Sequence, residues 1–439
     1  MKKYLIVALP LIMSAMLAEG QNGFNVPFSQ FGIGLSEMPY NMPSVYSMGG
    51  ITTTRAARNM VNPFNPASYA AVEEESLVFD IGVNIQTSIL RKDDSRLSNA
   101  AGNISHLAVA FPLTRWWKTS VGLMPYSQVD YETVSTAYDD LSGSDVKTVY
   151  SGGGGVSQVY WGNAFNIGRR LSVGFNLDYL YGNITRAVTY NFMGNDTTYM
   201  MDKRGQKDTY VNNLLIDLGV QYRHPVGERY TLNMGLTATL PRTMNVKDRS
   251  LVYTLVQTAT QEYLIDTVFP ATGDDDTYLS RLEQPLTLGM GLALERNDLW
   301  QVACDFHYAP WGGMKYTENS AYSIFGHSSE SYEPNIRVAI GGEWMGNKNA
   351  TSYWRRIGVC LGGYYNKGRL SLSMPDATTL DEIGCGVGLA LPMRKGRSVL
   401  NISAGYASFG NLDLLRRDCF TVGLSVGSCE RWFVKRKYN

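Results

Sequence analysis

The sequence predicts an all-β protein: a transmembrane antiparallel β-barrel of about fourteen strands whose lumen holds an N-terminal plug, or hatch. Three observations lead to this fold class. The chain opens with an export signal, its body repeats short segments in which apolar and polar residues alternate, and the connections between these segments alternate between short and long. No later apolar run reaches the roughly 18 residues that a transmembrane helix needs, so strands must make any membrane crossing.

The first twenty residues have the features of a secretory signal peptide. Lys2 and Lys3 form a positive start, an apolar stretch follows at 4–17, and Ala18-Glu19-Gly20 offers small residues for cleavage before Gln21. No Cys follows this site, so we do not expect a lipoprotein. The signal predicts export, and together with the strand pattern it predicts a location in the outer membrane of a Gram-negative cell.

The strand pattern has a period of two residues, as in Leu77, Phe79, Ile81 and Val83, which alternate with polar or small residues. Such alternation gives an extended strand one apolar and one polar face. In a barrel the apolar face contacts outer-membrane lipid, and aromatic residues near the strand ends suit the membrane interfaces. Fourteen segments show the pattern: 77–89, 107–113, 117–123, 159–165, 171–181, 214–222, 230–240, 286–294, 300–308, 336–344, 357–365, 383–391, 400–406 and 420–426.

The connections between these segments alternate in length. Short turns follow the even strands at 114–116, 166–170, 224–229, 295–298, 345–353 and 392–397. Longer polar segments follow the odd strands, and the largest are 127–155, 191–208, 247–283 and 310–333. Transmembrane barrels have short periplasmic turns and long external loops, whereas a soluble β-sandwich or propeller has no reason to alternate. We therefore expect the barrel over residues 77–433 and a periplasmic tail at 434–439.

Composition excludes several other classes. The formal net charge of zero gives no electrostatic basis for a nucleic-acid partner. The four His are scattered, and the acidic run 274–276 lacks the later ligands of a calcium loop, so we expect no metal. The glycines at 152–155 precede a strand and not a helix, which rules out a phosphate cradle. With no Gly-x-Ser-x-Gly elbow either, the sequence predicts neither an enzyme nor a bound cofactor.

Five Cys in an exported chain raise the question of disulfides. Cys385 lies in the apolar phase of its strand and Cys360 in the opposite phase. If these two strands are neighbours, the thiols point to opposite faces and cannot bond. We therefore expect small, unpaired, partly buried cysteines.

Residues 21–76 do not follow the strand pattern. They place apolar side chains among Gly, Pro, Ser and Asn, which is too apolar for a free tail and too irregular for a separate domain. A plug inside the barrel lumen explains both facts, and a disordered linker is the alternative. Four carboxylates lie in the inward phase of their strands, and they either line a polar pore, hold the plug through Arg55 and Arg58, or are only wetted lumen residues. They are Asp80, Asp178, Asp217 and Asp305.

The end of this segment resembles a known family. The stretches Met48-Gly49-Gly50, Thr54-Arg55-Ala56-Ala57-Arg58 and Asn65-Pro66-Ala67-Ser68-Tyr69 are similar to the hatch-to-barrel junction of the FadL/TodX family of outer-membrane transport proteins. The family's fourteen-stranded barrels match the count above. The ending at 431–439 also resembles the tails of family barrels from Bacteroidota.

The resemblance implies passive uptake of small hydrophobic or amphipathic compounds through the outer membrane. The family's ligand-pocket residues do not match position by position, so none is transferred. The family passes its ligands through a wall opening where a strand kinks inward, and Gly152, Gly153, Gly154 and Gly155 are candidates for it because glycine permits the bend. The alternative is an accessory barrel in outer-membrane protein secretion or assembly, which binds a surface or assembly protein through its long loops. The sequence leaves both functions open.

Overall fold

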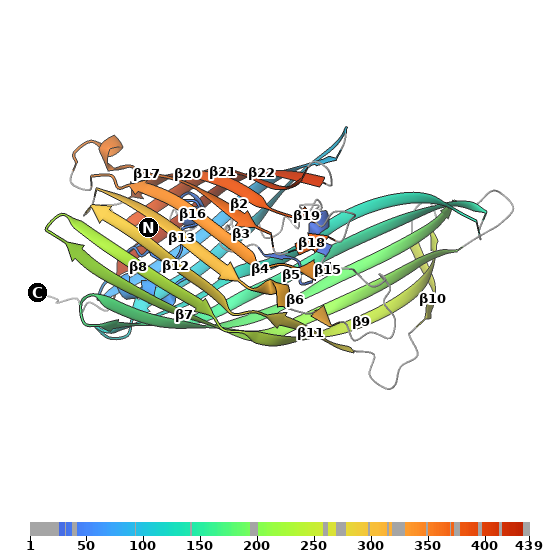
Figure 1. The fold of residues 1–439 in the computed structure, drawn as a ribbon, viewed down its shortest axis with the longest axis horizontal. Helices are drawn as coiled ribbons and strands as arrows, with labels where there is room; N and C mark the ends of the chain where they lie inside the picture. Colours follow the sequence, from blue (N-terminus) through green and yellow to red (C-terminus); the bar gives the residue numbers. More distant parts are fainter. Residues whose placement is uncertain are drawn as a thin grey trace, which may run out of the picture.

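The computed structural model describes residues 26–30, 32–36, 42–92, 94–140, 143–193, 201–257, 262–268, 278–296, 299–313, 316–317, 330–347, 350–368, 370–372, 378–393, 397–411 and 415–432. The predicted signal peptide at 1–20, the acidic run at 274–276 and the tail at 434–439 lie outside these ranges. Within them the chain is almost entirely strand (Figure 1).

Five short helical turns occur in the described ranges: η1 (Pro27–Gln30), α2 (Pro43–Tyr46), η2 (Pro66–Ala71), η3 (Trp311–Gly313) and η4 (Tyr353–Arg356), of which α2 alone is α-helical. The strands of the first half are β1 (Leu35–Ser36), β2 (Ser76–Lys92), β3 (Ser95–Pro112), β4 (Trp117–Asp139), β5 (Ser144–Ile167), β6 (Leu171–Met193), β7 (Asp202–Val226), β8 (Tyr230–Thr239), β9 (Arg242–Gln257) and β10 (Glu262–Val268). Those of the second half are β11 (Tyr278–Gln284), β12 (Thr287–Arg296), β13 (Trp300–Ala309), β14 (Tyr316–Thr317), β15 (Glu330–Tyr332), β16 (Asn335–Trp344), β17 (Gly358–Lys367), β18 (Leu370–Leu372), β19 (Thr378–Thr379), β20 (Glu382–Met393), β21 (Ser398–Asn411) and β22 (Leu415–Arg431).

Fourteen strands form one closed antiparallel barrel, as the sequence predicts. Each barrel strand pairs with the barrel strand that follows it. The last strand, β22, pairs with β2 from Ser76–Arg431 to Arg91–Arg416, which closes the wall. The barrel order is β2, β3, β4, β5, β6, β7, β8, β12, β13, β16, β17, β20, β21 and β22. Closure leaves no free sheet edge to satisfy in lipid.

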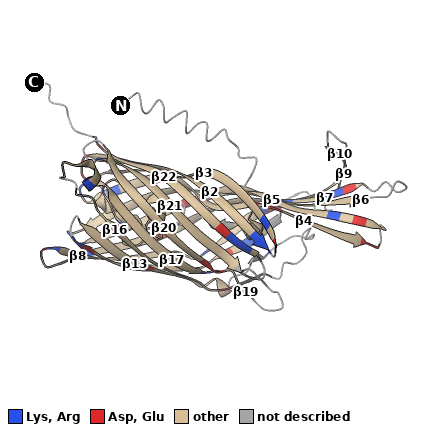
Figure 2. Cartoon of the chain, turned by 90° about the horizontal axis from the view of Figure 1, so that it is seen from above, with Lys and Arg blue, Asp and Glu red and all other residues tan. Residues whose placement is uncertain are grey.

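The faces of the strands follow the predicted alternation. Leu236, Ile340 and Leu361 point outward and are 56%, 63% and 65% exposed, whereas inward neighbours such as Asp305 are buried. Charged residues gather toward the strand ends and leave a largely uncharged band between them (Figure 2). The band is the face that a lipid bilayer covers. No helix within the described ranges is both long and apolar enough to cross a membrane.

The cysteines follow the same parity. β17 and β20 are neighbours, Cys360 is buried on the inner face, and Cys385 is exposed on the outer face, as predicted. All five cysteines carry free thiols in the structure.

Three of the predicted long loops are instead continuations of strands. β4 and β5 continue through most of 127–155 and pair as far as Asp139–Ser144, β6 and β7 extend into 191–208, and β9, β10 and β11 occupy much of 247–283. β9 continues the line of β8 and pairs with β7, so these strands form one sheet that projects far beyond the rest of the barrel (Figure 1). The prediction failed because a strand with water on both sides has no apolar phase, and its Thr, Ser, Gly and Tyr resemble a loop.

The projecting sheet has an ordered inner face. Ile33 packs there with apolar residues of β4, β5, β6, β7, β9 and β11. Farther out along the projecting sheet, Lys207 pairs with Asp248 at 3.3 Å, and Thr209 donates to the same carboxylate at 2.7 Å. Both charged groups are buried, so the pair must be satisfied internally, which holds β7 and β9 in register.

Candidate functional site in the barrel lumen

Residues 42–72, here called the lumen segment, lie inside the barrel against the inward faces of its strands. Met42, Met48 and Ile51 have no exposed surface, and Val45 and Tyr46 are also buried. Two apolar clusters join the segment to the wall, one around Met48 and Ile51 and the other around Val61 and Tyr69. The apolar side chains that seemed out of place in the sequence therefore have a core, which the barrel supplies.

The wall meets the lumen segment through inward-facing glycines. A Cβ atom built on Gly174 would lie 2.6 Å from the carbonyl carbon of Pro66, and one built on Gly341 would overlap the carbonyl oxygen of Met48. Backbone thus lies directly on backbone, which only glycine permits. The same holds at Gly235, Gly362, Gly386 and Gly427, and we call these six positions the glycine belt.

Two of the four predicted inward carboxylates bind the lumen segment. Asp305 on β13 accepts hydrogen bonds from the backbone N–H groups of Thr52 at 2.6 Å and Thr53 at 2.9 Å, and from both threonine hydroxyls. Asp80 on β2 accepts from the N–H of Val61 at 3.1 Å and lies 3.0 Å from His106 Nε2. Asp80 and Asp305 therefore contact this segment through its backbone amides, which favours the holding role among the alternatives that the sequence leaves open.

The two arginines have other partners. Arg55 lies 3.3 Å from Glu343 of β16 and is buried, whereas Arg58 pairs with Glu73 at 3.0 Å where both side chains are exposed. Burial opposes the charged form of Arg55, but Glu343, Cys360 and Asp80 together more than offset it, so the pKa of Arg55 is raised. The ion pairs of Arg55 and Arg58 are thus formed with Glu343 and Glu73 and not with the four aspartates, because sequence parity does not show which acidic residue lies nearest.

The Asn-Pro-Ala motif shapes the end of the lumen segment. Asn65 caps η2 by accepting from the N–H of Ala67 at 3.1 Å, and its amide donates to the carbonyl of Thr53 at 2.6 Å. Pro66 occupies the first helical turn, where no N–H is needed. Behind the motif, the Tyr69 hydroxyl donates to Asn176 Oδ1 at 3.0 Å, and burial raises the pKa of Tyr69. The motif therefore fixes a turn that is docked on β6 and β7.

A second stretch of chain, residues 26–36, crosses the lumen nearer the projecting sheet. Its β1 pairs with Ser127 and Gln128 of β4, and Arg186 of β6 donates to the carbonyls of Gln30 and Gly32 at 2.9 and 2.6 Å. These contacts hold the stretch against the wall. The described N-terminal residues thus occupy the lumen at two levels. That they block the barrel to ions stays a prediction.

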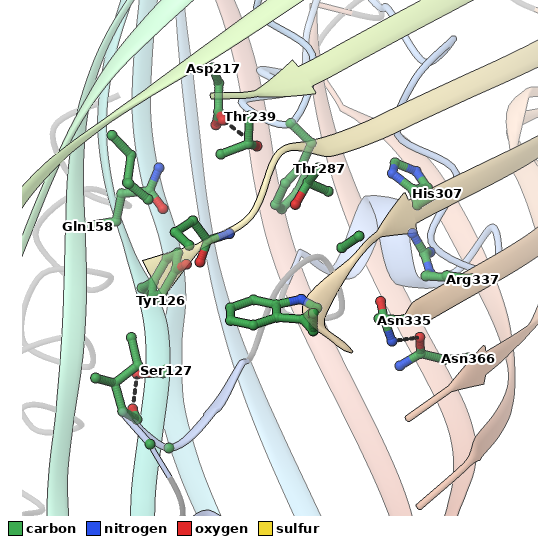
Figure 3. Close-up of a pocket in the computed structure, with 18 of the residues that line it drawn as sticks. Tyr126, Ser127, Gln158, Asp217, Thr239, Thr287, His307, Asn335, Arg337 and Asn366 are labelled. Atoms are coloured by element: carbon green, nitrogen blue, oxygen red, sulfur yellow. Dashed lines mark hydrogen bonds between the residues drawn. The ribbon is translucent and has the colours of Figure 1, made fainter. Parts of the chain in front are cut away.

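A cavity of about 340 Å³ lies between the two levels (Figure 3). Phe28 and Ile33 line it from one level and Thr52 and Phe64 from the other. The rest of the lining is mixed: apolar Leu215, Leu282 and Leu380 occur beside polar Gln158, Asp178, Asp217, Gln284, His307, Arg337, Asn366 and Glu382.

The other two predicted carboxylates, Asp178 and Asp217, line this cavity and do not bind the lumen segment. Asp178 accepts from Gln158 Nε2 at 2.7 Å, and Asp217 accepts from the Thr239 hydroxyl at 2.6 Å. Sequence reasoning missed Gln158, Gln284, Arg337 and Glu382 as lining residues. The parity of their strands was available as a signal, but polar residues of this phase occur on every strand, and nothing in the sequence says which of them share one cavity.

The barrel wall has a short ladder between β3 and β4. These strands pair only from Leu107–Leu123 to Pro112–Lys118, whereas β2 pairs with β3 from Val78–Ala110 to Lys92–Ser95. Each of the two strands has a β-bulge just beyond this short ladder, at Ser105 in β3 and at Tyr126 in β4. Beyond Leu107 the two strands separate toward the projecting sheet.

The four glycines that the sequence predicts as a wall opening do not lie at the short β3–β4 ladder. Gly152–Gly155 are in β5 and are paired with β4 on one side and β6 on the other. Gly154 has a φ of 103°, a conformation that L-residues with a side chain avoid. An opening at these glycines stays a prediction.

No three His, Cys, Asp or Glu side chains of the described residues lie close enough together to hold a metal ion. The polar groups of the lumen instead hydrogen-bond to one another and to the lumen segment. This chemistry suits docking of chain or binding of a small molecule.

Solved outer-membrane channels share the fold. The CymD monoaromatic hydrocarbon channel is 13% identical with a TM-score of 0.55, over 90% of this chain and 98% of that one. The toluene transporter TbuX of Ralstonia pickettii is 12% identical with a TM-score of 0.54, over 92% and 99%. A FadL homologue of Pseudomonas aeruginosa is 12% identical with a TM-score of 0.54, over 93% and 100%.

These likenesses confirm the FadL/TodX-type barrel that the hatch motif predicts, and at such identities they show the fold alone. None of the curated proteins compared with the chain matches its sequence. The Bacteroidota likeness of the tail stays a prediction. One family does match in sequence over residues 1–439, and its description is BamG. The chain therefore belongs to the BamG family.

Proposed function

We propose that this chain is a non-enzymatic accessory barrel of the outer membrane that serves protein secretion or assembly and binds a partner protein through its projecting sheet. The observation that carries the proposal is the length of four neighbouring strands. β4, β5, β6 and β7 have 23, 24, 23 and 25 residues, and a tilted strand needs only about 9–11 to cross a bilayer. More than half of each strand is therefore available outside the membrane.

The projecting sheet offers a surface for a partner. The side chains from Glu132 to Tyr138 are exposed on both faces of β4, and Val134 and Tyr138 are 51% and 65% exposed. Exposed aromatic and aliphatic residues on a rigid sheet are typical of protein interfaces. The chain enters the barrel at Ser76 and leaves it at Arg431 on the opposite, short-turn end. Because short turns of such barrels are periplasmic, we infer that the projecting sheet is extracellular.

The contents of the lumen support a closed barrel. The lumen segment is held by buried hydrogen bonds to Asp80 and Asp305, by the Arg55–Glu343 ion pair and by the glycine belt. Residues 26–36 add a second level. A solute could pass only if the lumen segment and this second level moved aside. That movement would expose apolar side chains and leave buried polar groups without partners, so its cost in free energy opposes transport as the main activity.

Passive uptake of a small hydrophobic or amphipathic compound is the second candidate function. The cavity between the two levels and the short β3–β4 ladder favour it, because the strand separation offers a sideways path from the lumen to lipid. The relatives in fold carry the names of hydrocarbon channels.

The test of partner binding uses the face of β4 that carries Val134 and Tyr138. We expect the double variant Val134→Lys/Tyr138→Lys to lose cross-linking to its partner in intact cells and to lower the amounts of other outer-membrane proteins. The control variant Thr133→Lys/Ser135→Lys adds the same charges to the opposite face of the same strand. Equal, wild-type behaviour of both variants in cells would exclude this face as the docking surface.

A deletion separates the two functions. Removing residues 21–60 should leave an insertable barrel, since the wall begins at Ser76, and this barrel should conduct ions in planar bilayers while the intact chain stays nearly silent. Under the uptake function the deletion also changes cellular uptake of a hydrophobic compound. Under the accessory function it does not, and large conductance from the intact chain would contradict a closed barrel.

A further inference from the structure

One wall of the lumen cavity carries hydrogen-bond acceptors for which the described residues supply no donor. Gln158 Oε1, Asp178 Oδ2 and Gln284 Oε1 are buried and have no hydrogen-bond partner among the described residues. The three side chains are only 5%, 1% and 7% exposed, and all three line the cavity. Buried acceptors without donors cost free energy, which a bound donor recovers.

The orientation of Gln158 is set by its neighbour. Its Nε2 donates to Asp178 Oδ1 at 2.7 Å, so a flipped amide would place two acceptor oxygens against each other. Gln158 Oε1 therefore receives no hydrogen bond from this neighbour. Figure 3 shows the Gln158 side chain extending from β5 into the cavity. Together Gln158 and Asp178 present two unused acceptors at one corner.

A second carboxylate lies beside this corner. On the paired strands β6 and β7, Asp178 lies opposite Leu215 and Asp217 lies opposite Asn176, so the two carboxylates are diagonal neighbours on the inner face. Thr239 donates one hydrogen bond to Asp217. No arginine or lysine lines the cavity on this side.

The charges of the opposite wall have their own partners. Arg337 donates to the carbonyls of Gly49 and Gly50 at 3.3 and 2.5 Å, and Glu382 accepts from Tyr364 at 2.8 Å. His307 lies against Thr52 and Asp305. Among the described residues, the lining thus includes three carboxyl groups and one guanidinium, and two of the three carboxyl groups lie at the Asp178–Asp217 corner.

We propose that the cavity binds a small amphipathic cation, whose primary ammonium group donates to Gln158, Asp178 and Asp217. A primary ammonium has three donors and a positive charge, which suits this acceptor corner. Leu215, Leu282 and Phe64 supply an apolar surface for the rest of the molecule. The cavity volume of about 340 Å³ is in the range of small-ligand sites. The site is independent of whether the projecting sheet binds a partner.

Three probes of equal length test the chemistry: hexylammonium, 1-hexanol and hexanoate. Binding to the full mature chain in nanodiscs is measured by calorimetry, with empty nanodiscs as the blank for partitioning into lipid. We expect hexylammonium to bind at least tenfold more tightly than 1-hexanol, and hexanoate to bind most weakly. Equal affinity of all three probes, tighter binding of hexanoate, or no binding of hexylammonium would overturn the proposal. The last result would show that Asp178 and Asp217 satisfy each other by sharing a proton.

Variants locate the site within the chain. Asp178→Asn removes the corner charge and should weaken hexylammonium binding at least tenfold, while Glu295→Gln, a wall carboxylate outside the cavity lining, should change it less than twofold. Gln284→Glu adds a carboxylate to the acceptor wall and should tighten binding several-fold, which gives a readout even if Asp178→Asn does not fold. The proposal fails if Glu295→Gln weakens binding as much as Asp178→Asn, or if Gln284→Glu leaves it unchanged.

Discussion

Asp305 is the wall residue that the lumen segment uses most, and its removal should undock that segment. The carboxylate accepts two backbone N–H groups and two hydroxyls, from Thr52 and Thr53. In Asp305→Ala the hydroxyls turn to other acceptors, but the two N–H groups stay buried. Each buried donor without a partner costs about 1–3 kcal/mol, so docking should weaken by about 2–6 kcal/mol. Asp305→Asn keeps one acceptor oxygen and should lose about half as much.

The effect appears as a population of undocked segment. Every 1.4 kcal/mol is a factor of ten, so a loss of about 3 kcal/mol raises the undocked fraction more than a hundredfold. Limited proteolysis of the barrel in nanodiscs should then cleave within residues 42–72 of Asp305→Ala far faster than in the parent chain. Heat-modifiable gel mobility, which reports the strand wall, should stay unchanged.

Asp217→Ala is the matched control, because Asp217 is an inward carboxylate of a neighbouring part of the wall that accepts from Thr239 and not from the lumen segment. Its proteolysis rate should stay near that of the parent chain. If Asp305→Ala and Asp217→Ala are cleaved at the same rate, the lumen segment does not depend on the Asp305 hydrogen bonds and the reasoning is refuted.

Three further predictions concern the wall. Leu236→Arg places a charge on the lipid face and should cost about 2–4 kcal/mol in refolding into bilayers, while inward Thr237→Arg should cost less; equal costs would contradict the assigned faces. Gly341→Val would overlap Met48 and should release the lumen segment to protease, whereas a Cβ on the adjacent Gly342 lies 3.5 Å from its nearest neighbour, so Gly342→Val should not. The chain should fractionate with the outer membrane and show heat-modifiable mobility, and recovery as a soluble periplasmic protein would exclude a spanning barrel.

The strand wall was predictable because lipid imposes a simple rule on it. Outward residues such as Leu236 and Ile340 must be apolar and inward residues need not be, so the period of two is visible wherever the wall crosses the membrane. The same rule explains the failure at 127–155. Beyond the bilayer β4 has water on both faces, the apolar phase stops at Val134, and the strand continues without a signal.

The interior was predictable only in part, because its contacts join residues far apart in the chain. The inward phase of Asp80 and Asp305 was correct, but only the structure shows that their partners are backbone amides of residues 52, 53 and 61. The sequence shows that glycine is abundant, but it does not show that some of these glycines contact the lumen segment. That contact depends on which strand lies against which residues of the segment, and a single sequence does not contain this information.

The glycine belt has a consequence for the order of assembly. Because backbone lies on backbone at positions such as Gly174 and Gly341, no space remains for residues 42–72 to slide into a finished cylinder. The first and last strands, β2 and β22, meet along their full lengths. The wall is therefore expected to wrap around the N-terminal chain as it zips, with that chain serving as an internal template, and the β2–β22 seam to close last. A fragment that supplies residues 42–72 in trans, to a barrel that lacks them, should then enter the lumen only when it is present before the seam forms.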